Sequence, residues 1–159
     1  MSTHSPAPSP RPQPPIPPGA EAAPPPPDMS PLPVGTRIGW EVVEGVLGSG
    51  GFATVYRVRS PDGYVSALKL LPLDQGEERA ARAWREVSLG MRLHHPNLVR
   101  QLGAGQWPHD NPRYVWVKLE RVEGPTLEEW APGRPLGEVV ERVLEVARAL
   151  AVSHEAGVL

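Results

Sequence analysis

The apolar and polar positions along the chain predict a series of short β-strands that begins near residue 36. Segments that alternate between apolar and polar residues, are rich in β-branched side chains and are bounded by turn-forming residues are typical of half-buried strands. Residues 60–63 (SPDG) and 108–112 (PHDNP) are such turn signals. The strands are expected at residues 38–48, 52–60, 64–71, 98–107 and 113–122.

A helical spacing of apolar residues replaces the strand pattern between the third and fourth strands. Residues 77–93 carry apolar side chains three and four positions apart, which predicts a helix. Asp74 and Glu77 have the spacing of a capping box at its start. Pro96 disfavours helix at the residue before it, so the helix should end ahead of it.

Two further helices are predicted near the end of the chain. Residues 126–130 form a short one, with a capping-box spacing between Thr126 and Glu129. Residues 135–157 form a long one, with Gly157 as its terminator. Its apolar stripe consists of Leu136, Val139, Val140, Val143, Ala147, Leu150 and Ala151.

The order of these elements predicts the fold class. Three strands, a helix, two strands and then helices follow one another, and the strands have hairpin-length connections. Such connections favour an antiparallel sheet with one packed helix, which is an α+β fold.

Composition divides the chain into two regions. Residues 1–35 hold most of the 22 prolines and few large apolar side chains, so we expect a disordered tail with polyproline II character. Its P-x-x-P spacings leave open a second reading, a docking site for a proline-recognising domain. Residues 36–159 are expected to form the folded unit.

Charge and composition exclude several classes of protein. The net charge is −2 and the chain has no cysteine, so we expect no nucleic-acid partner, no disulfide and no metal site built on thiolates. We find no apolar run of bilayer-spanning length and no secretory leader. We therefore expect a cytoplasmic location and no membrane segment.

The candidate chemistry starts at residues 47–58, LGSGGFATVYRV. Gly48, Gly50 and Gly51 could reach positive φ and let a phosphate approach the backbone, but a plain hairpin turn uses the same residue. Taken alone, this segment leaves both readings open.

Lys69 favours the phosphate reading. It lies within a strand, where a lysine is costly unless it is paired or faces a ligand, and strand alternation places it on one face with Val65 and Ala67. Glu86 on the predicted helix is the natural counter-charge. The alternatives are a lysine that snorkels from an edge strand and a solvated Glu86 that pairs with Arg82.

Taken in order, these motifs resemble the N-terminal lobe of a protein kinase, and most closely the eukaryotic-type serine/threonine kinases of bacteria. LGSGGFATVY resembles the glycine-rich loop of the family and SALK resembles the strand with the nucleotide-binding lysine. WREVSLGMRLHHPNLV resembles the regulatory helix and its exit, and YVWVKLERVEGPTLEEW resembles the fifth strand, hinge and short helix. VLEVARALAVSHEAGVL resembles the helix that leads to the catalytic loop.

The resemblance implies an α+β kinase lobe with a five-stranded antiparallel sheet, one regulatory helix and an ATP site. Lys69, paired with Glu86, would engage the phosphates, and Leu119 would be the gatekeeper. His95 and His154 match family histidines with structural roles. The ATP-binding residues that the resemblance implies are Leu47, Gly48, Ser49, Gly50, Gly51, Phe52, Ala53, Thr54, Val55, Ala67, Lys69, Leu119, Glu120 and Val122.

The sequence departs from the family pattern in two places. Ala53 replaces the third glycine of the loop, and the 159 residues end where the family continues into His-Arg-Asp. The family's catalytic base and Mg²⁺ ligands lie beyond that point, so we expect no phosphoryl transfer from these residues alone. We expect Mg²⁺ and a protein substrate only with the complete domain, and we expect the last helix to present an uncovered apolar face.

The alternative to a kinase half is a non-catalytic, kinase-like module. Such a module would bind a nucleotide or a partner and would use the proline-rich segment as a docking tail.

Overall fold

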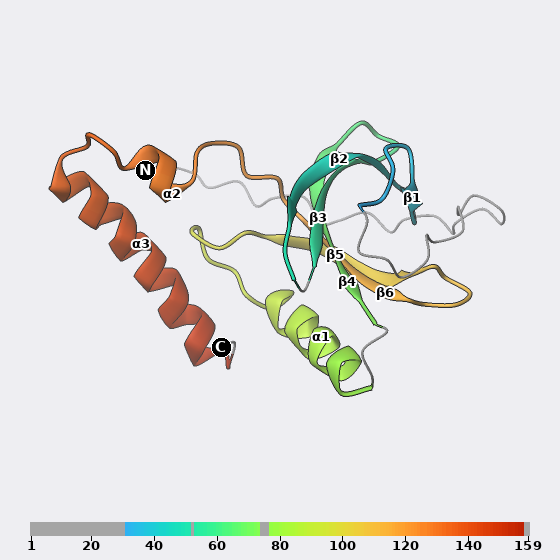
Figure 1. The fold of residues 1–159 in the computed structure, drawn as a ribbon. Helices are drawn as coiled ribbons and strands as arrows, with labels where there is room; N and C mark the ends of the chain where they lie inside the picture. Colours follow the sequence, from blue (N-terminus) through green and yellow to red (C-terminus); the bar gives the residue numbers. More distant parts are fainter. Residues whose placement is uncertain (1–30, 52, 74–76, 158–159) are drawn as a thin grey trace.

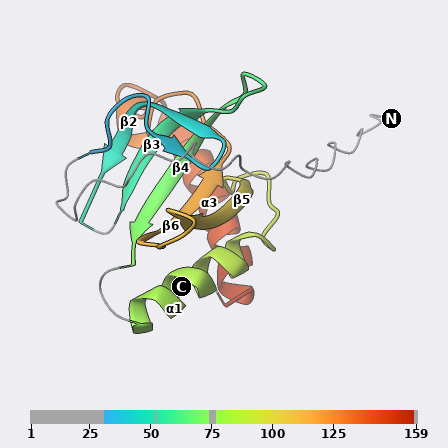
Figure 2. The same ribbon diagram turned by 90° about the vertical axis from the view of Figure 1, so that its right-hand side faces the viewer.

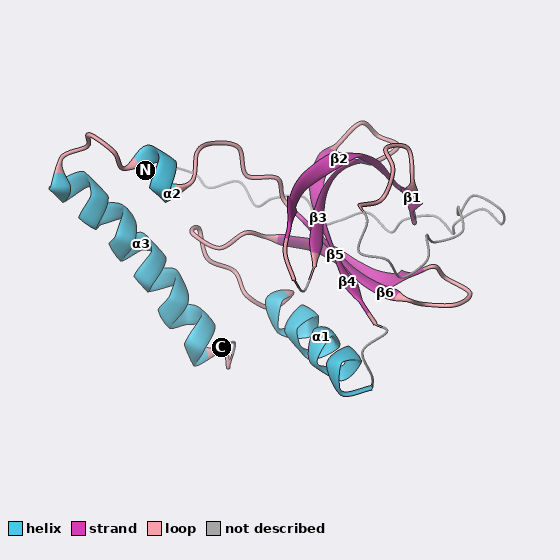
Figure 3. Cartoon of the chain, in the orientation of Figure 1, coloured by secondary structure: helices cyan, strands magenta, loops and turns pink. Residues whose placement is uncertain are grey.

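The computed structural model describes residues 31–51, 53–73 and 77–157. Within them a single six-stranded sheet is antiparallel throughout, in the order β1-β2-β3-β4-β6-β5 (Figure 1). Figure 3 shows α1 packed beside the curled sheet, while the other helices follow the last strand. The strands are β1 (Arg37–Ile38), β2 (Glu41–Ser49), β3 (Thr54–Arg59), β4 (Val65–Pro72), β5 (Gln101–Trp107) and β6 (Tyr114–Leu119).

The predicted fold class is confirmed, with one strand more than expected. The five predicted strands correspond to β2, β3, β4, β5 and β6. The additional strand, β1, has two residues, which is too short for an alternating pattern to show in the sequence.

The two faces of the sheet have separate apolar cores. The inner face of the curl is built around the fully buried Val43, Val58, Leu68 and Trp107. The other face packs Val115 and Val117 of β6 against Val87 of α1. Successive strand residues point to opposite faces, so the side of β4 with Leu68 and Leu70 belongs to the first core.

The inner core extends to residues before β1. Leu32 is 5% exposed and belongs to that core, and its N–H donates to the hydroxyl of Tyr56 at 3.0 Å. The sequence alone placed Leu32 in the proline-rich segment, ahead of the expected start of the folded unit at residue 36. Residues 1–30 of that segment lie outside the described part of the chain.

Helix α1 (Glu77–Gly90) ends three residues earlier than predicted. The helical spacing continues to Met91, but Gly90 is a poor helix former and a side chain there would collide with Gln101. The predicted capping box at Asp74 lies outside the described residues. Figure 2 shows α1 lying across one face of the sheet.

Helices α2 (Leu127–Trp130) and α3 (Leu136–Glu155) follow β6. The predicted capping box of α2 is confirmed: the N–H of Glu129 donates to the Thr126 hydroxyl, and the N–H of Thr126 donates to the Glu129 carboxylate. Gly157, at φ 78°, follows the end of α3, as expected of a terminator.

Helix α3 lies apart from the sheet in Figure 1 and exposes much of its apolar stripe. Leu136 is 78% exposed, and Val140, Val143 and Leu150 are each about half exposed. Among the described residues, no helix is both long enough and apolar enough to cross a membrane.

Candidate nucleotide-binding site

The glycine-rich segment is the hairpin that joins β2 to β3. The N–H of Gly50 donates to the carbonyl of Ala53 at 3.0 Å and closes the turn. Gly48, Gly50 and Gly51 are not among the described glycines with positive φ, so this hairpin does not use that conformational freedom of glycine. A Cβ at any of the three would meet no atom within 4 Å, so the hairpin has open space beside its backbone.

Strand register places the hairpin beside the predicted lysine. Gly48 pairs with Val55, Val55 pairs with Lys69, and Lys69 pairs with Val117. Directly paired residues of neighbouring strands have side chains on the same face. Val55 and Lys69 therefore share the face of the sheet on which α1 packs.

The neighbouring row of paired strand residues contains two more residues that were predicted to contact the nucleotide, Ala67 and Leu119. Ala67 pairs with Leu119, so both lie on the face with Lys69, two residues along β4. Ala67 is 9% exposed. Val55, Ala67, Lys69 and Leu119 therefore form one continuous patch on this face. Of the remaining predicted residues, Leu47, Ser49 and Thr54 lie at the ends of β2 and β3, and Phe52 lies outside the described residues.

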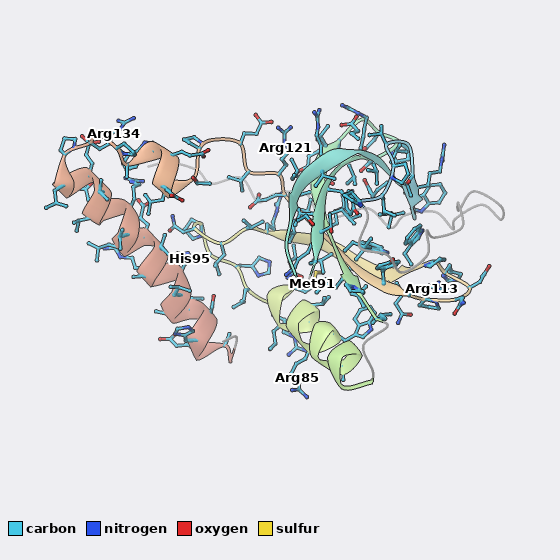
Figure 4. The ribbon with its side chains drawn as sticks, in the orientation of Figure 1. Arg85, Met91, His95, Arg113, Arg121 and Arg134 are labelled. Carbon is cyan, nitrogen blue, oxygen red and sulfur yellow. The ribbon has the colours of Figure 1, made fainter. Side chains whose placement is uncertain are left out.

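The chain after β6 is held to β5 through Glu120. Its N–H donates to the Arg100 carbonyl and its carboxylate accepts from the Arg100 N–H, both at 2.9 Å. The N–H of Glu120 is therefore engaged, so the carbonyl is the backbone group of this residue that a ligand could use. Val122, two residues on, is 69% exposed, and Figure 4 shows Arg121 between the two in this connection.

Glu86 lies on α1, next to the residue that anchors the helix. Val87 is 5% exposed and packs with Val117, the strand partner of Lys69. The backbone of Glu86 is therefore on the same face as Lys69. The side chain of Glu86 is outside the described residues, so the pairing of Glu86 with Lys69 stays a prediction.

A surface charge cluster borders the same patch. Arg57 pairs with Ala67 in the sheet and contacts Glu44 at 3.0 Å. A hydrogen bond from Arg59 lowers the pKa of Glu44, and the charges of Arg59, Arg57 and Arg121 add to this effect. The charge of Arg57 is thus balanced within the protein.

The two predicted histidines make local backbone contacts. His95 accepts a hydrogen bond on Nδ1 from the N–H of Asn97 at 3.1 Å, in the connection that Figure 4 shows between α1 and β5. The carbonyl of His154 accepts from the N–H of Gly157 at the end of α3. The His154 contact involves only its backbone, so the structural roles expected for the two histidines stay predictions.

One polar cluster, on the opposite face of the sheet, was not predicted from the sequence. Lys118 contacts Glu41 at 2.6 Å, and both side chains are buried. A signal was present, because strand alternation places Lys118 on the face opposite Val117 and Leu119, where an unpaired charge would be costly.

Comparison with known proteins identifies the family of the chain. The family model for the protein kinase domain matches residues 42–159. Serine/threonine-protein kinase PknJ of Mycobacterium tuberculosis is 34% identical over 122 residues, which is 74% of this chain and 20% of the relative. Serine/threonine-protein kinase pkn3 of Myxococcus xanthus is 35% identical over 125 residues, which is 74% of this chain and 22% of the relative.

A solved structure extends the agreement to the fold. The kinase domain of Mycobacterium tuberculosis PknI, as its C20A mutant, superposes with a TM-score of 0.66 at 28% identity. The match covers 82% of this chain and 54% of the PknI chain.

The chain belongs to the protein kinase domain family. It spans an N-terminal portion of that domain and about a fifth of the length of the curated bacterial serine/threonine kinases that it matches.

Proposed function

We propose that this chain supplies the ATP-binding half of a serine/threonine protein kinase. The observation that carries the proposal is the strand register that aligns Gly48, Val55 and Lys69 in one row across β2, β3 and β4. Protein kinases hold a nucleoside triphosphate with a glycine-rich hairpin, an apolar residue that covers the base and a lysine that contacts the phosphates. Gly48, Val55 and Lys69 are these three parts in the proposed site.

Each residue of the patch would contact a different part of ATP. Leu47 and Val55 would cover the adenine from the hairpin side, with Ala67 beneath it and Leu119 at the back. The Glu120 carbonyl and the backbone of Val122 would hydrogen-bond the adenine edge. Lys69, oriented by Glu86, would engage the α- and β-phosphates.

Phosphoryl transfer is proposed for the complete domain. Kinases transfer the γ-phosphoryl group by positioning and by electrostatic stabilisation, with Mg²⁺ held by an aspartate and an asparagine of other motifs. We assign no Mg²⁺ ligand to the described residues, in which no cluster of three or more potential ligands occurs. Protein serine or threonine is the proposed substrate of the complete domain, by its relation to the kinases compared above.

A cytoplasmic location is part of the proposal, since ATP is the proposed ligand. A partner for the proline-rich segment stays a prediction from sequence, because residues 1–30 lie outside the described part.

The test is ATP binding to the chain and to its Lys69→Ala variant. We expect the variant to bind about tenfold more weakly or worse, a loss of about 1.4 kcal/mol or more, because it lacks the phosphate-facing ammonium. Arg85→Ala is the matched control, since it removes one positive charge from an exposed position on α1 (Figure 4). Equal affinity of the chain and of Lys69→Ala contradicts the proposal.

A labelling experiment sharpens this test. The chain has two lysines, Lys69 and Lys118, and strand alternation places them on opposite faces of the sheet. An acyl-phosphate derivative of ATP transfers its acyl group to a nearby lysine amine and releases ATP. We expect acylation of Lys69, suppressed by excess ATP, and none of Lys118. ATP-insensitive labelling of both lysines contradicts the proposed site.

A further inference from the structure

Three buried polar side chains form a closed triangle on the inner face of the sheet. Lys118 Nζ donates to Glu41 Oε1 at 2.6 Å and to Ser60 Oγ at 2.8 Å, and Ser60 Oγ donates to Glu41 Oε2 at 2.8 Å. All three residues are less than 10% exposed. The aromatic ring of Tyr64 lies 5.9 Å from the Lys118 ammonium.

The triangle connects strands that are not neighbours in the sheet. Glu41 begins β2 and Lys118 lies on β6, with β3 and β4 between them. Three strand spacings cover about 14 Å in a flat sheet, so side chains that stand perpendicular to it would not meet. The contact therefore spans the concave side of the curled sheet and depends on how tightly the sheet is curled (Figure 2).

Each corner of the triangle lies on or next to a strand that leads to the proposed nucleotide site, although Glu41 and Ser60 are at the ends of β2 and β3 that lie away from the glycine hairpin. Lys118 immediately precedes Leu119 and Glu120. Strand β2 begins at Glu41 and runs to the glycine hairpin at Ser49. Strand β3 runs back from that hairpin, and Ser60 directly follows its last residue. The triangle thus connects β2 and β3, the strands of the glycine hairpin, to β6, the strand that precedes the hinge. It does so on the face of the sheet opposite the proposed ligand.

A buried ion pair is well suited to fix geometry. The surrounding inner core is apolar, so a charge that leaves its partner would be buried without compensation. An apolar pair of similar volume commonly preserves stability, since it avoids the desolvation cost. What the ion pair adds is one defined distance between the strands that it joins.

We propose that Glu41, Lys118 and Ser60 act as positioning residues that set the separation between the glycine hairpin and the hinge, and thereby the affinity for ATP. The effect on affinity rests on the function proposed above. The effect on separation does not, so the two can fail independently.

The first experiment removes the triangle without leaving a lone buried charge. The double variant Glu41→Leu with Lys118→Met should stay folded, as shown by a cooperative thermal transition, yet bind ATP about tenfold more weakly. Glu145→Gln is the control, because it breaks the exposed Arg142–Glu145 ion pair on α3. Wild-type ATP affinity in the folded double variant overturns the positioning role.

The second experiment measures the separation itself. Because the chain has no cysteine, spin labels can be placed at Ser49→Cys and Glu123→Cys, both exposed, and nowhere else. We expect a narrow distance distribution in the parent chain and a broader or shifted one with Glu41→Leu and Lys118→Met. Identical distributions overturn the proposal whatever the ATP result.

Two further results are also decisive. If the parent chain binds no ATP, the proposed function fails, and the label distances alone decide whether the triangle sets the separation. If the double variant does not fold, Ser60→Ala replaces it, since this change removes one corner and keeps the ion pair. A smaller shift in the same distance is then expected, and its absence overturns the proposal.

Discussion

The indole ring of Trp116 occupies the space in which a side chain at Gly105 would lie. The two residues are direct partners on β6 and β5, and a Cβ at Gly105 would stand 2.7 Å from one ring carbon and 2.8 Å from another. Trp116 also packs against the inner core. The glycine therefore makes room for the ring.

Gly105→Ala should destabilise the sheet. The ring is rigid and partly buried, so we expect a loss of about 1–3 kcal/mol in the free energy of unfolding, typical of overpacking. Urea denaturation measures it. Gly103→Ala is the matched control on the same strand, because the nearest atom to its Cβ would be at 3.9 Å. Equal effects at both positions would contradict the assigned contact.

Tyr56→Phe should loosen the segment before β1. The change removes the hydroxyl that accepts the Leu32 N–H and leaves a buried donor unsatisfied, at a cost of about 1–3 kcal/mol. We expect faster amide exchange at Leu32 and a lower urea midpoint. Tyr64→Phe, at an exposed tyrosine, should leave both unchanged. Unaltered exchange at Leu32 in Tyr56→Phe would show that the hydrogen bond is unimportant.

The capping box of α2 should weaken in acid. Hydrogen bonds from the backbone N–H and then the hydroxyl of Thr126 lower the pKa of Glu129 below its ordinary value. The folded state thus binds fewer protons at this carboxyl than the unfolded state does. The contribution of the Glu129 carboxylate to stability is therefore complete above the pKa of the unfolded chain, and it is lost as the pH falls through the lowered pKa of the folded state.

Replacing Thr126 tests this directly. In Thr126→Val the hydroxyl is absent, and the pKa of Glu129, followed by NMR titration, should rise toward its ordinary value. Thr126→Ser should keep the low pKa. A pKa that is the same in the valine and serine variants would exclude the hydroxyl as a cause.

Val122→Pro tests the hinge part of the proposed ATP site. Proline removes the backbone N–H, so one hydrogen bond to the adenine edge, worth about 1 kcal/mol or roughly fivefold in affinity, should be lost. Val122 is exposed, so the thermal midpoint should change little. Val122→Ala keeps the N–H and should bind ATP like the parent chain. Equal ATP affinity in the two variants would remove Val122 from the site.

Local patterns were sufficient to predict most of the sheet. Alternation along residues 64–71 located β4 and showed which side Lys69 takes, and the proline and glycine signals located the turns. The two-residue β1 was missed because it has no periodicity, and α1 ends at Gly90, earlier than the apolar spacing implied, because glycine is a poor helix former.

Features that depend on three-dimensional curvature were beyond the sequence. Alternation could place Glu41 and Lys118 on the inner face, but their contact depends on how strongly four strands curl. The burial of Leu32 likewise arises because the chain before β1 covers the inner core, which no pattern within the proline-rich segment indicates.

The Glu41–Lys118 contact also has a consequence for the time course of folding. It joins residues 77 positions apart, and loop closure of that length must precede its formation. During synthesis the β2–β3 hairpin emerges long before Lys118, so Glu41 has no buried counter-charge until β6 has docked. We therefore expect the strands on both sides of the curl to complete their packing in one late, cooperative step.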